Sequence, residues 1–347
     1  MLFRSDERLN ISYMVYTGAM LNIFPLPNDK NKKWYNPIEA MESFPKPEGD
    51  DIKQMVYGYF DAVEKAMDSG SWQEANKFLA EIKKYQDFYG AAIMPSQTKI
   101  EAEIFYYNYN IFKMLMPVYS IVGFALLLVS LAGVLKPSIK SAYVLKGAQI
   151  IFGLAFLLHT LALALRWYIS GHAPWSDGYE SMIYISWATI FAGLLLVRNT
   201  PLALSAAAIL TAIVLFTAHL SWMDPQITNL VPVLNSYWLT IHVSVITASY
   251  GFFGLSALLG VLVLLLMILH KEDNSERIKN NIAELTYINE INILIGLALL
   301  TIGNFLGGVW ANESWGRYWG WDPKETWALV TIILYAFVAH VRFIKPI

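Results

Sequence analysis

The segment from Trp310 to Trp327, WANESWGRYWGWDPKETW, concentrates residues suited to holding a flat ligand. Its aromatic residues fall within 18 positions and are Trp310, Trp315, Tyr318, Trp319, Trp321 and Trp327. Indole and phenol rings present flat apolar faces to a large conjugated molecule, and Arg317 and Lys324 can pair with its carboxylates. An aromatic belt at a membrane interface usually explains one or two tryptophans at the end of a span. We therefore favour a platform for a planar ligand, with an interfacial belt as the alternative.

The end of this segment also has the pattern of a helix start. Asp322, Pro323 and Glu325 suit the N-cap, the first and the third position of a helix. The aromatic segment is therefore expected to be anchored to the start of the last helix, and the role of Asp322 is then structural. Upstream, Gly303 and Gly307 form a small-xxx-small face, which lets a membrane helix pack closely against a neighbour.

Histidines are the other candidates for chemistry, because a neutral imidazole can ligate a metal. The chain has six: His159, His172, His219, His242, His270 and His340. A single histidine within a membrane is more often a hydrogen-bonded core residue than a ligand. By position, His159 suits the core and His270 a cytoplasmic flank. His172 and His219 are expected to face outward, with nothing else to support a ligand role.

His242 and His340 are expected at different depths. The apolar segment Trp238–Leu269 has 32 residues, about 48 Å as one helix against a hydrocarbon core of about 30 Å. If its cytoplasmic end is near Leu269, His242 lies at the outer interface, level with the tryptophan segment. His340 follows Pro323 by 17 residues, about 25 Å along the last helix and so inside the bilayer. The two histidines cannot form one axial pair, and two separate sites are predicted if both bind metal.

These residues need a frame of membrane helices to position them. Of the 347 residues, 56% are hydrophobic and 15% are charged, too apolar for an ordinary soluble domain of this length. A span needs roughly 20 apolar residues, and the qualifying segments are about Leu115–Leu135, Gly147–Trp167, Tyr179–Val197, Pro201–Leu220, Trp238–Leu269, Ile291–Trp310 and Trp327–Ile344. The predicted fold class is an all-α, polytopic membrane bundle of about seven spans.

Lysine and arginine in the short connections predict the orientation, because cytoplasmic connections carry more of them. One side has nine, which are Lys136, Lys140, Lys146, Arg198, Lys271, Arg277, Lys279, Arg342 and Lys345. The other side has four, which are Lys113, Arg166, Arg317 and Lys324. The side with nine is expected to be cytoplasmic, which leaves residues 1–112 and the connections 168–178, 221–237 and 311–326 outside.

Residues 1–112 are predicted to form an extracytoplasmic, mainly helical domain before the membrane domain 113–347. They hold 16 of the 27 acidic and 12 of the 25 basic side chains. Asp51–Met67 and Trp72–Tyr85 have helical apolar spacing around a turn signal, which predicts a helical hairpin. Lys99–Phe112 is expected to continue into the first span. The chain start lacks a signal-peptide pattern, so we expect an upstream span of a longer protein to carry this domain across.

Composition excludes several kinds of chemistry. A net charge of −2 without a long basic run gives no electrostatic footprint for nucleic acid, so no nucleic-acid partner is predicted. The absence of cysteine excludes disulfides, thiolate metal sites and a thiol nucleophile. We predict no catalytic nucleophile in this chain, and any sulfur chemistry must use the thiols of a partner.

The stretch WGRYWGWDPKETW resembles the WWD signature of the tryptophan-rich cytochrome c assembly proteins, which include CcsA/ResC, CcmC and CcmF. Three other stretches agree with this family, and they are RWYISGHAPWSDGYESMIYISW at Arg166–Trp187, SYWLTIHVSVITASYG at Ser236–Gly251, and HVRF after the last span. The resemblance covers about residues 115–347. Together with residues 1–112 it is similar to a fused CcsB–CcsA cytochrome c synthase that is cut within the CcsB-like half.

The resemblance implies haem b as the bound molecule and names candidate residues for it. His242 matches the family's first external haem ligand and His340 its intramembrane ligand, both axial to iron. The WWD loop 310–327 is implied to present the haem through Trp310, Trp315, Trp319, Trp321, Asp322 and Trp327, with Arg317 and Lys324 beside the propionates. The family places the second ligand of each site in segments that this chain lacks, so the chain supplies one ligand of each pair.

The function implied is that of a cytochrome c synthase (haem lyase) component of the bacterial inner, or cytoplasmic, membrane. Haem is held at the outer face for thioether attachment to the CxxCH motif of apocytochrome c. The implied partners are apocytochrome c, a CcsB/ResB-like half or subunit, thiol-reducing proteins of the outer compartment and membrane lipid. One alternative is a haem-binding or export subunit without lyase activity. Another is a proton-coupled transporter in which His340 relays protons.

Overall fold

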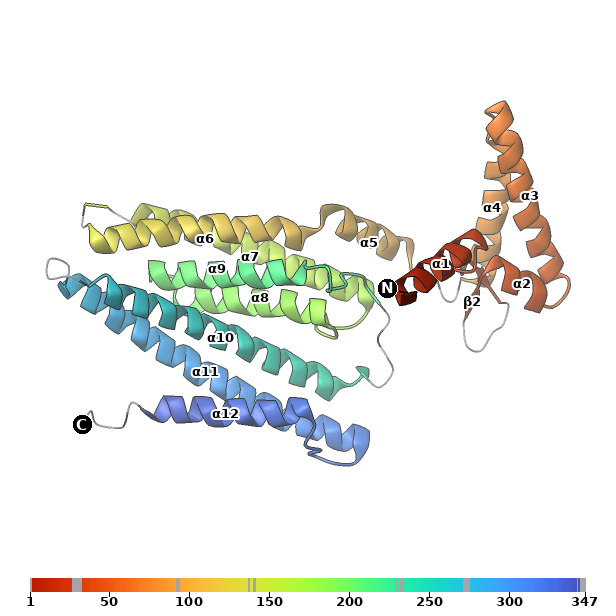
Figure 1. Ribbon diagram of the computed structural model, residues 1–347. Helices are drawn as coiled ribbons and strands as arrows, with labels where there is room; N and C mark the ends of the chain where they lie inside the picture. Colours follow the sequence, from red (N-terminus) through yellow and green to blue (C-terminus); the bar gives the residue numbers. More distant parts are fainter. Residues whose placement is uncertain are drawn as a thin grey trace. The chain divides into compact units, whose positions relative to one another are not determined.

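The computed structural model describes residues 2–26, 33–91, 94–136, 138–139, 142–228, 230, 234–270, 275–341 and 343. The chain forms two compact units, Met1–Gln97 and Thr98–Ile347, and their elements are labelled in Figure 1. Some of the predicted cytoplasmic residues lie outside the described residues, namely Lys140, Lys271, Arg342 and Lys345, as does Ile344 at the end of the last predicted span.

The first unit is mainly helical and contains the predicted hairpin. Its elements are α1 (Leu2–Tyr16), β1 (Phe24–Pro25), β2 (Trp34–Tyr35), α2 (Pro37–Ser43), α3 (Glu48–Ser69) and α4 (Gln73–Tyr89). The turn between α3 and α4 has Gly70 at φ 72°, a left-handed conformation that glycine adopts without steric cost. Phe24, Ile52 and Tyr85 are buried in the core of this unit. The short antiparallel pair β1–β2 was not predicted, because two-residue strands carry no alternating pattern.

The second unit is a bundle of long apolar helices, which lie side by side in Figure 1. After α5 (Gln97–Tyr109) come α6 (Ile111–Leu135), α7 (Ala142–Ser170), α8 (Gly178–Leu196), α9 (Pro201–Ala218), α10 (Tyr237–Ile268), α11 (Ser275–Trp315) and α12 (Pro323–Val341). Within the described ranges, seven helical segments are long and apolar enough to cross a membrane. The prediction of an all-α bundle with seven spans is confirmed.

Several helices extend beyond the apolar segments that predicted them. The helix α11 has 41 residues and includes Trp310 and Trp315, which were expected in the loop. The loop proper therefore begins at Gly316, whose φ of 70° suits the end of a helix. Hydropathy marks only the part of a helix that matches the bilayer, whereas the backbone hydrogen bonds continue into polar flanks. As predicted, the helix before the first span leads directly into it: only Asn110 separates α5 from α6.

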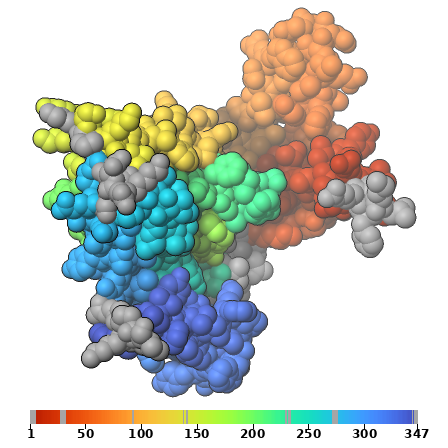
Figure 2. Space-filling model, turned by 60° about the vertical axis from the view of Figure 1, so that its left-hand side comes forward, coloured from red at the N-terminus to blue at the C-terminus, as the bar shows by residue number. Residues whose placement is uncertain are grey.

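The centre of the bundle is built from small residues. In α9, Ala207 and Ala208 are fully buried, and 67% of its most apolar stretch lies inside the bundle, against 6% for α12. A Cβ on Gly193 of α8 would lie 2.6 Å from the Cβ of Ala207, so these two helices meet almost backbone to backbone. Figure 2 shows α12 in dark blue at the edge of this unit, on the side away from the yellow α6.

Three connections lie at the same end of the bundle (Figure 1). Helices α7, α9 and α11 end there, and α8, α10 and α12 begin there. These connections are the ones predicted to be outside the membrane. They bring the start of α10, with His242, to the same end as the tryptophan segment.

Candidate functional site

A cavity of about 830 Å³ lies at this end of the bundle, within the range of about 300–1,000 Å³ that is typical of small-molecule sites. Its walls come from the connection before α8, from α10 and α11, and from the start of α12. Val243, Ile246 and Tyr250 supply apolar surface from α10. Ser176 and Thr331 both line the cavity. The cavity is therefore assembled from segments that are far apart in the sequence.

His242 lines this cavity from the second turn of α10 and is half-buried. Its Nδ1 lies 2.7 Å from the carbonyl oxygen of Gly303. A carbonyl only accepts hydrogen bonds, so Nδ1 carries the proton, and in the neutral ring Nε2 keeps its lone pair. Metal-ligating histidines are commonly held in this way, with the second nitrogen donating to a carbonyl or carboxylate. The geometry of His242 thus suits a metal ligand.

The tryptophans divide into two groups. Trp310, Trp319 and Trp327 line the cavity, although Trp310 is on α11 and Trp327 on α12. Trp315 and Trp321 do not line it and are 60% and 70% exposed. The ring of Trp321 meets Trp319 edge to face, with centroids 5.6 Å apart. The structure therefore brings only part of the predicted aromatic set to the cavity.

Two of the cavity tryptophans have an indole N–H for which the described part of the chain provides no hydrogen-bond acceptor. The indole Nε1 atoms of Trp310 and Trp319 are buried, and neither has a hydrogen-bond acceptor within the described part of the chain. A buried donor left unpaired costs about 1–3 kcal/mol. An acceptor atom on a ligand or an ordered water is the kind of partner that these two groups lack.

The charged residues at the cavity have different tasks. The Oδ1 of Asp322 accepts from the N–H of Glu325 at 2.8 Å, so the predicted N-cap of the last helix is confirmed. The carboxylate of Glu325 in turn accepts from the N–H of Gly320 at 2.7 Å. Lys324 lines the cavity. Arg317 packs against the backbone at Gly320, where a Cβ would lie 2.6 Å from its Cζ, and is not part of the lining.

The other histidines are placed apart from His242, with one exception. His340 is exposed at the end of α12, and its Nδ1 contacts the carbonyl of Ala336 in its own helix at 2.7 Å. His159 is fully buried on α7, with Nε2 3.1 Å from the carbonyl of Ile183, which agrees with the core role predicted for it. The exception is His172, which lines the same cavity as His242.

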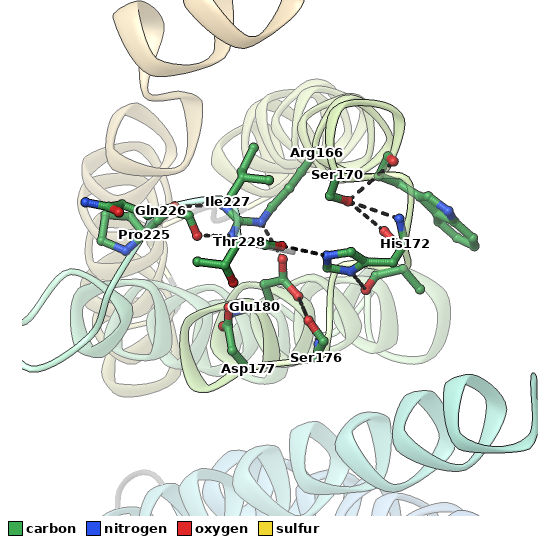
Figure 3. A network of polar contacts seen from close by, with 12 residues as sticks. Arg166, Ser170, His172, Ser176, Asp177, Glu180, Pro225, Gln226, Ile227 and Thr228 are labelled. Atoms are coloured by element: carbon green, nitrogen blue, oxygen red, sulfur yellow. Dashed lines mark hydrogen bonds and ion pairs between the residues drawn. The ribbon is translucent and has the colours of Figure 1, made fainter. Parts of the chain in front are cut away.

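His172 is a cavity residue that sequence reasoning left unsupported. Its Nδ1 lies 3.2 Å from the carbonyl of Ala173, and its Nε2 lies 3.2 Å from the carbonyl of Thr228. Both nitrogens face backbone oxygens (Figure 3), and in the neutral ring one of them donates a hydrogen bond while the other keeps its lone pair. The contact with Thr228 joins two connections far apart in the sequence, and no local pattern signals it.

A buried ion pair holds the same two connections together. The Nε of Arg166 donates to Oε1 of Glu180 at 2.8 Å, and the two side chains are 0% and 1% exposed. The guanidinium also donates to the carbonyls of Pro225 and Gln226 at 2.9 and 3.0 Å, as Figure 3 shows. The second carboxylate oxygen accepts from the Ser176 hydroxyl at 2.6 Å. Every polar atom of this pair therefore helps to fix the loops beside the cavity.

Asp177 lines the cavity and also contacts Glu180 of this ion pair. Its Oδ1 accepts from the N–H of Glu180 at 2.7 Å and caps the start of α8. Burial raises the pKa of the Asp177 carboxyl, and the hydrogen bond from Glu180 opposes this. Asp177 and Asp322 both line the cavity, and each uses one carboxylate oxygen to cap a helix.

Comparison with known proteins identifies the family. A family model described as cytochrome C assembly protein matches residues 175–346. The chain is 35% identical to the cytochrome c biogenesis protein CcsA of Guillardia theta over 251 residues, which is 65% of this chain and 82% of that protein. The chain belongs to the cytochrome c assembly protein family.

This chain covers a smaller share of two further relatives. Protein NrfI of Wolinella succinogenes is 46% identical over 345 residues, which is 99% of this chain but 38% of that protein. The cytochrome c biogenesis protein CcsA of Chlamydomonas reinhardtii is 38% identical over 204 residues, 57% of this chain and 58% of that protein. This cytochrome c assembly protein thus spans less than two thirds of the length of either relative.

Membership of the family implies haem handling, the task that cytochrome c assembly requires. His242 and the cavity tryptophans fall within the matched residues 175–346, whereas His172 lies three positions before them. This cytochrome c assembly protein is therefore a multi-pass membrane protein, and most of the residues named at the cavity fall within the region matched by the family model.

Proposed function

We propose that this protein binds haem b in the cavity beside His242 and presents it at the outer membrane face. Apocytochrome c then receives the haem through thioether bonds at its CxxCH motif. The observation that carries the proposal is the geometry of His242, whose Nδ1 bonds to Gly303 while the ring lines a cavity with three tryptophans. A neutral imidazole held in this way offers Nε2 to iron as an axial ligand.

The other cavity residues suit the remaining parts of haem. Trp310, Trp319 and Trp327 provide aromatic surface for a large conjugated ring. Lys324 also lines the cavity, and its ammonium group can pair with a propionate. The unpaired indole N–H groups at the wall can donate to a propionate oxygen directly or through water.

The attachment needs no nucleophile from this chain, which has no cysteine. Each thiol of the CxxCH motif adds across one haem vinyl group, so that a carbon–sulfur bond forms and the thiol hydrogen ends on the neighbouring vinyl carbon. No group leaves and no net oxidation occurs, and the thiols must therefore arrive reduced. The contribution of the protein is to hold vinyl groups and thiols in register, which lowers the entropic part of the barrier.

The wider arrangement is also part of the proposal. His340 binds haem at a second site within the bacterial inner membrane, and residues 1–112 and the tryptophan loop face the outer compartment. A CcsB/ResB-like half or subunit supplies the second ligand of the His340 site, and thiol-reducing proteins of the outer compartment keep the CxxCH cysteines reduced. A haem-binding or export subunit without lyase activity is the second candidate, and a proton-coupled transporter is the third.

The test uses the full chain purified in detergent and titrated with haemin. We expect a low-spin Soret spectrum in the presence of imidazole, loss of the haemin bound at the His242 site in His242→Ala without it, and recovery of that site when imidazole is added. His219→Ala is the matched control, because its Nδ1 bonds to the carbonyl of Leu215 in its own helix. Binding of haemin at the wild-type level by His242→Ala would contradict the proposed ligand.

A second step separates lyase from carrier. The haem-loaded protein is reduced and incubated with a reduced peptide that contains CxxCH, and thioether formation is followed by the shift of the pyridine haemochrome band and by mass spectrometry. Thioether formation supports the synthase assignment. Haem binding without thioether formation, even with a CcsB-like partner present, favours the carrier.

A further inference from the structure

Two glycines of α11 set how closely it approaches α10 beside His242. A Cβ on Gly303 would lie 2.6 Å from Cγ1 of Ile246. A Cβ on Gly307 would lie 2.7 Å from Nδ1 and 3.1 Å from Nε2 of His242. Contacts below 3.0 Å are essentially never made by real Cβ atoms. An alanine at either position would therefore force either the contacted side chain or the helix to shift.

This spacing determines which hydrogen bond the imidazole makes. The His242 ring lies against Gly307, where a Cβ would clash with its Cε1, and its Nδ1 lies 2.7 Å from the carbonyl oxygen of Gly303, one turn earlier on α11. An alanine at position 307 would occupy the place of the ring. The ring or the helix would have to move, and the hydrogen bond to the carbonyl would lengthen.

We propose that Gly307 is a positioning residue that fixes the orientation and the tautomer of the His242 ring. Glycine at this position allows the Nδ1–H tautomer to pair with Gly303 and leaves Nε2 as the nitrogen with a lone pair. The consequence for haem rests on the proposed function, whereas the consequence for the tautomer does not. Groups that orient a metal-ligating histidine typically change the affinity for the metal by about 10- to 100-fold.

Close helix packing alone is the simpler explanation of a glycine here, and the chain contains its own comparison. Gly296 also lies on α11, and a Cβ there would be 2.9 Å from Cε1 of Phe253 on α10. Alanine at 296 therefore disturbs the same helix pair without touching His242. Gly260 on α10 has no atom within 4 Å of the position of its Cβ and serves as a neutral site.

The first test needs no haem. The protein is labelled with ¹⁵N in its histidine rings, and the signal of His242 is assigned by its loss in His242→Asn. We expect the Nδ1–H tautomer in the wild type, in Gly260→Ala and in Gly296→Ala. In Gly307→Ala we expect the signal to move to the Nε2–H tautomer or to an exchanging mixture. A purely structural role for Gly307 predicts the same tautomer in all four proteins.

The second test uses haemin. Gly307→Ala should weaken haemin binding by about 10- to 100-fold, whereas Gly296→Ala should lower the thermal midpoint but keep the haemin affinity of the wild type. Added imidazole should restore the low-spin spectrum in His242→Ala. It should fail in the double variant His242→Ala/Gly307→Ala, because the new methyl group occupies the space of the missing ring.

The two sets of results distinguish the failures. If no form of the protein binds haemin but the tautomer changes in Gly307→Ala, the proposed function fails and the positioning role stands. If Gly307→Ala is folded and keeps both the tautomer and the haemin affinity of the wild type, the positioning role is overturned. Should Gly307→Ala not fold, Gly303→Ala decides, because it displaces the accepting carbonyl through Ile246 and leaves the ring itself untouched. An unchanged tautomer in that variant also overturns the proposal.

Discussion

At the scale of single residues, the tryptophans of the WWD segment differ in what they can contact. Trp310, Trp319 and Trp327 line the cavity, whereas Trp315 and Trp321 are largely exposed. A ligand in the cavity is therefore in reach of the first group only. The exposed pair is placed where an interfacial belt would meet lipid headgroups, whereas the three lining tryptophans are placed where the proposed ligand platform would be.

We expect Trp319→Ala to weaken haemin binding by about tenfold, because an aromatic contact contributes about 0.5–1.5 kcal/mol beyond its buried area. Trp315→Ala should change it little. Haemin titration of both purified variants measures the difference, and the amount of each protein in the membrane shows whether insertion is intact. Equal haemin affinity in the two variants would favour the belt alone.

The proposed propionate contact makes a charge-specific prediction. Lys324→Gln should lower the affinity for haemin by about fivefold, which corresponds to about 1 kcal/mol for a partly exposed ion pair. It should not change the affinity for haemin dimethyl ester, whose carboxylates are blocked. Arg317→Gln is the control, since Arg317 packs on Gly320 outside the cavity. A loss of affinity for both ligands in Lys324→Gln would mean that the lysine acts on the loop and not on a propionate.

Sequence patterns located the residue types of this cavity but not their orientation. His242 and the tryptophans stood out through depth and aromatic density, which are properties of a local stretch. His172 and Arg166 did not stand out. Their hydrogen-bond partners, Thr228 and Gln226, follow 56 and 60 positions later in the sequence. Contacts of this kind depend on the fold and leave no periodic signal in one sequence.

At the scale of elements, the start of α12 is fixed by a capping arrangement that also shapes the loop before it. Asp322 accepts from Glu325, and Glu325 accepts from Gly320 across the loop. Between them, Trp321 adopts a φ of 56°, which is uncommon for a residue with a side chain. The cap, the loop and the position of Trp319 are thus linked.

We expect Asp322→Ala to destabilise the start of α12 by about 1 kcal/mol, the usual effect of losing an N-cap, and to weaken haemin binding through the loop. Asp322→Asn keeps a capping oxygen and should behave like the wild type in both respects. Hydrogen exchange at the amide of Glu325 reports the cap, and haemin titration reports the site. If Asp322→Asn is as defective as Asp322→Ala, the carboxylate charge itself acts on the ligand, and the capping explanation is wrong.

The extent of the helices shows what hydropathy can predict. All seven predicted spans correspond to helices, and the cap signals at Asp322 were correct. The predicted end of the sixth span at Trp310 fell short of the observed end of α11 at Trp315. Residues 311–315 are too polar to score as membrane but are good enough helix formers to continue the backbone hydrogen bonds until Gly316.

At the scale of the whole molecule, the excess of lysine and arginine on one side predicts the orientation in the membrane. The chain has no cysteine, so single cysteines can be introduced without a background. Cysteines at Asp50 and Ser314 should react with an impermeant thiol reagent once the outer barrier is opened, and a cysteine at Asn199 should react only after lysis. All three positions are exposed. Reaction at position 199 in intact cells would reverse the orientation.

The buried pair of Arg166 and Glu180 has a consequence for the synthesis of the protein. The guanidinium reaches its acceptors on Glu180, Pro225 and Gln226, and these leave the ribosome at different times. A nascent chain that stops before residue 225 keeps the arginine next to the bilayer with only part of its five N–H groups paired. An incompletely paired cation is costly in such a place. Glu180, at the start of α8, supplies the counter-charge, but the chain must extend past α9 before the guanidinium has the carbonyl acceptors of Pro225 and Gln226 as well.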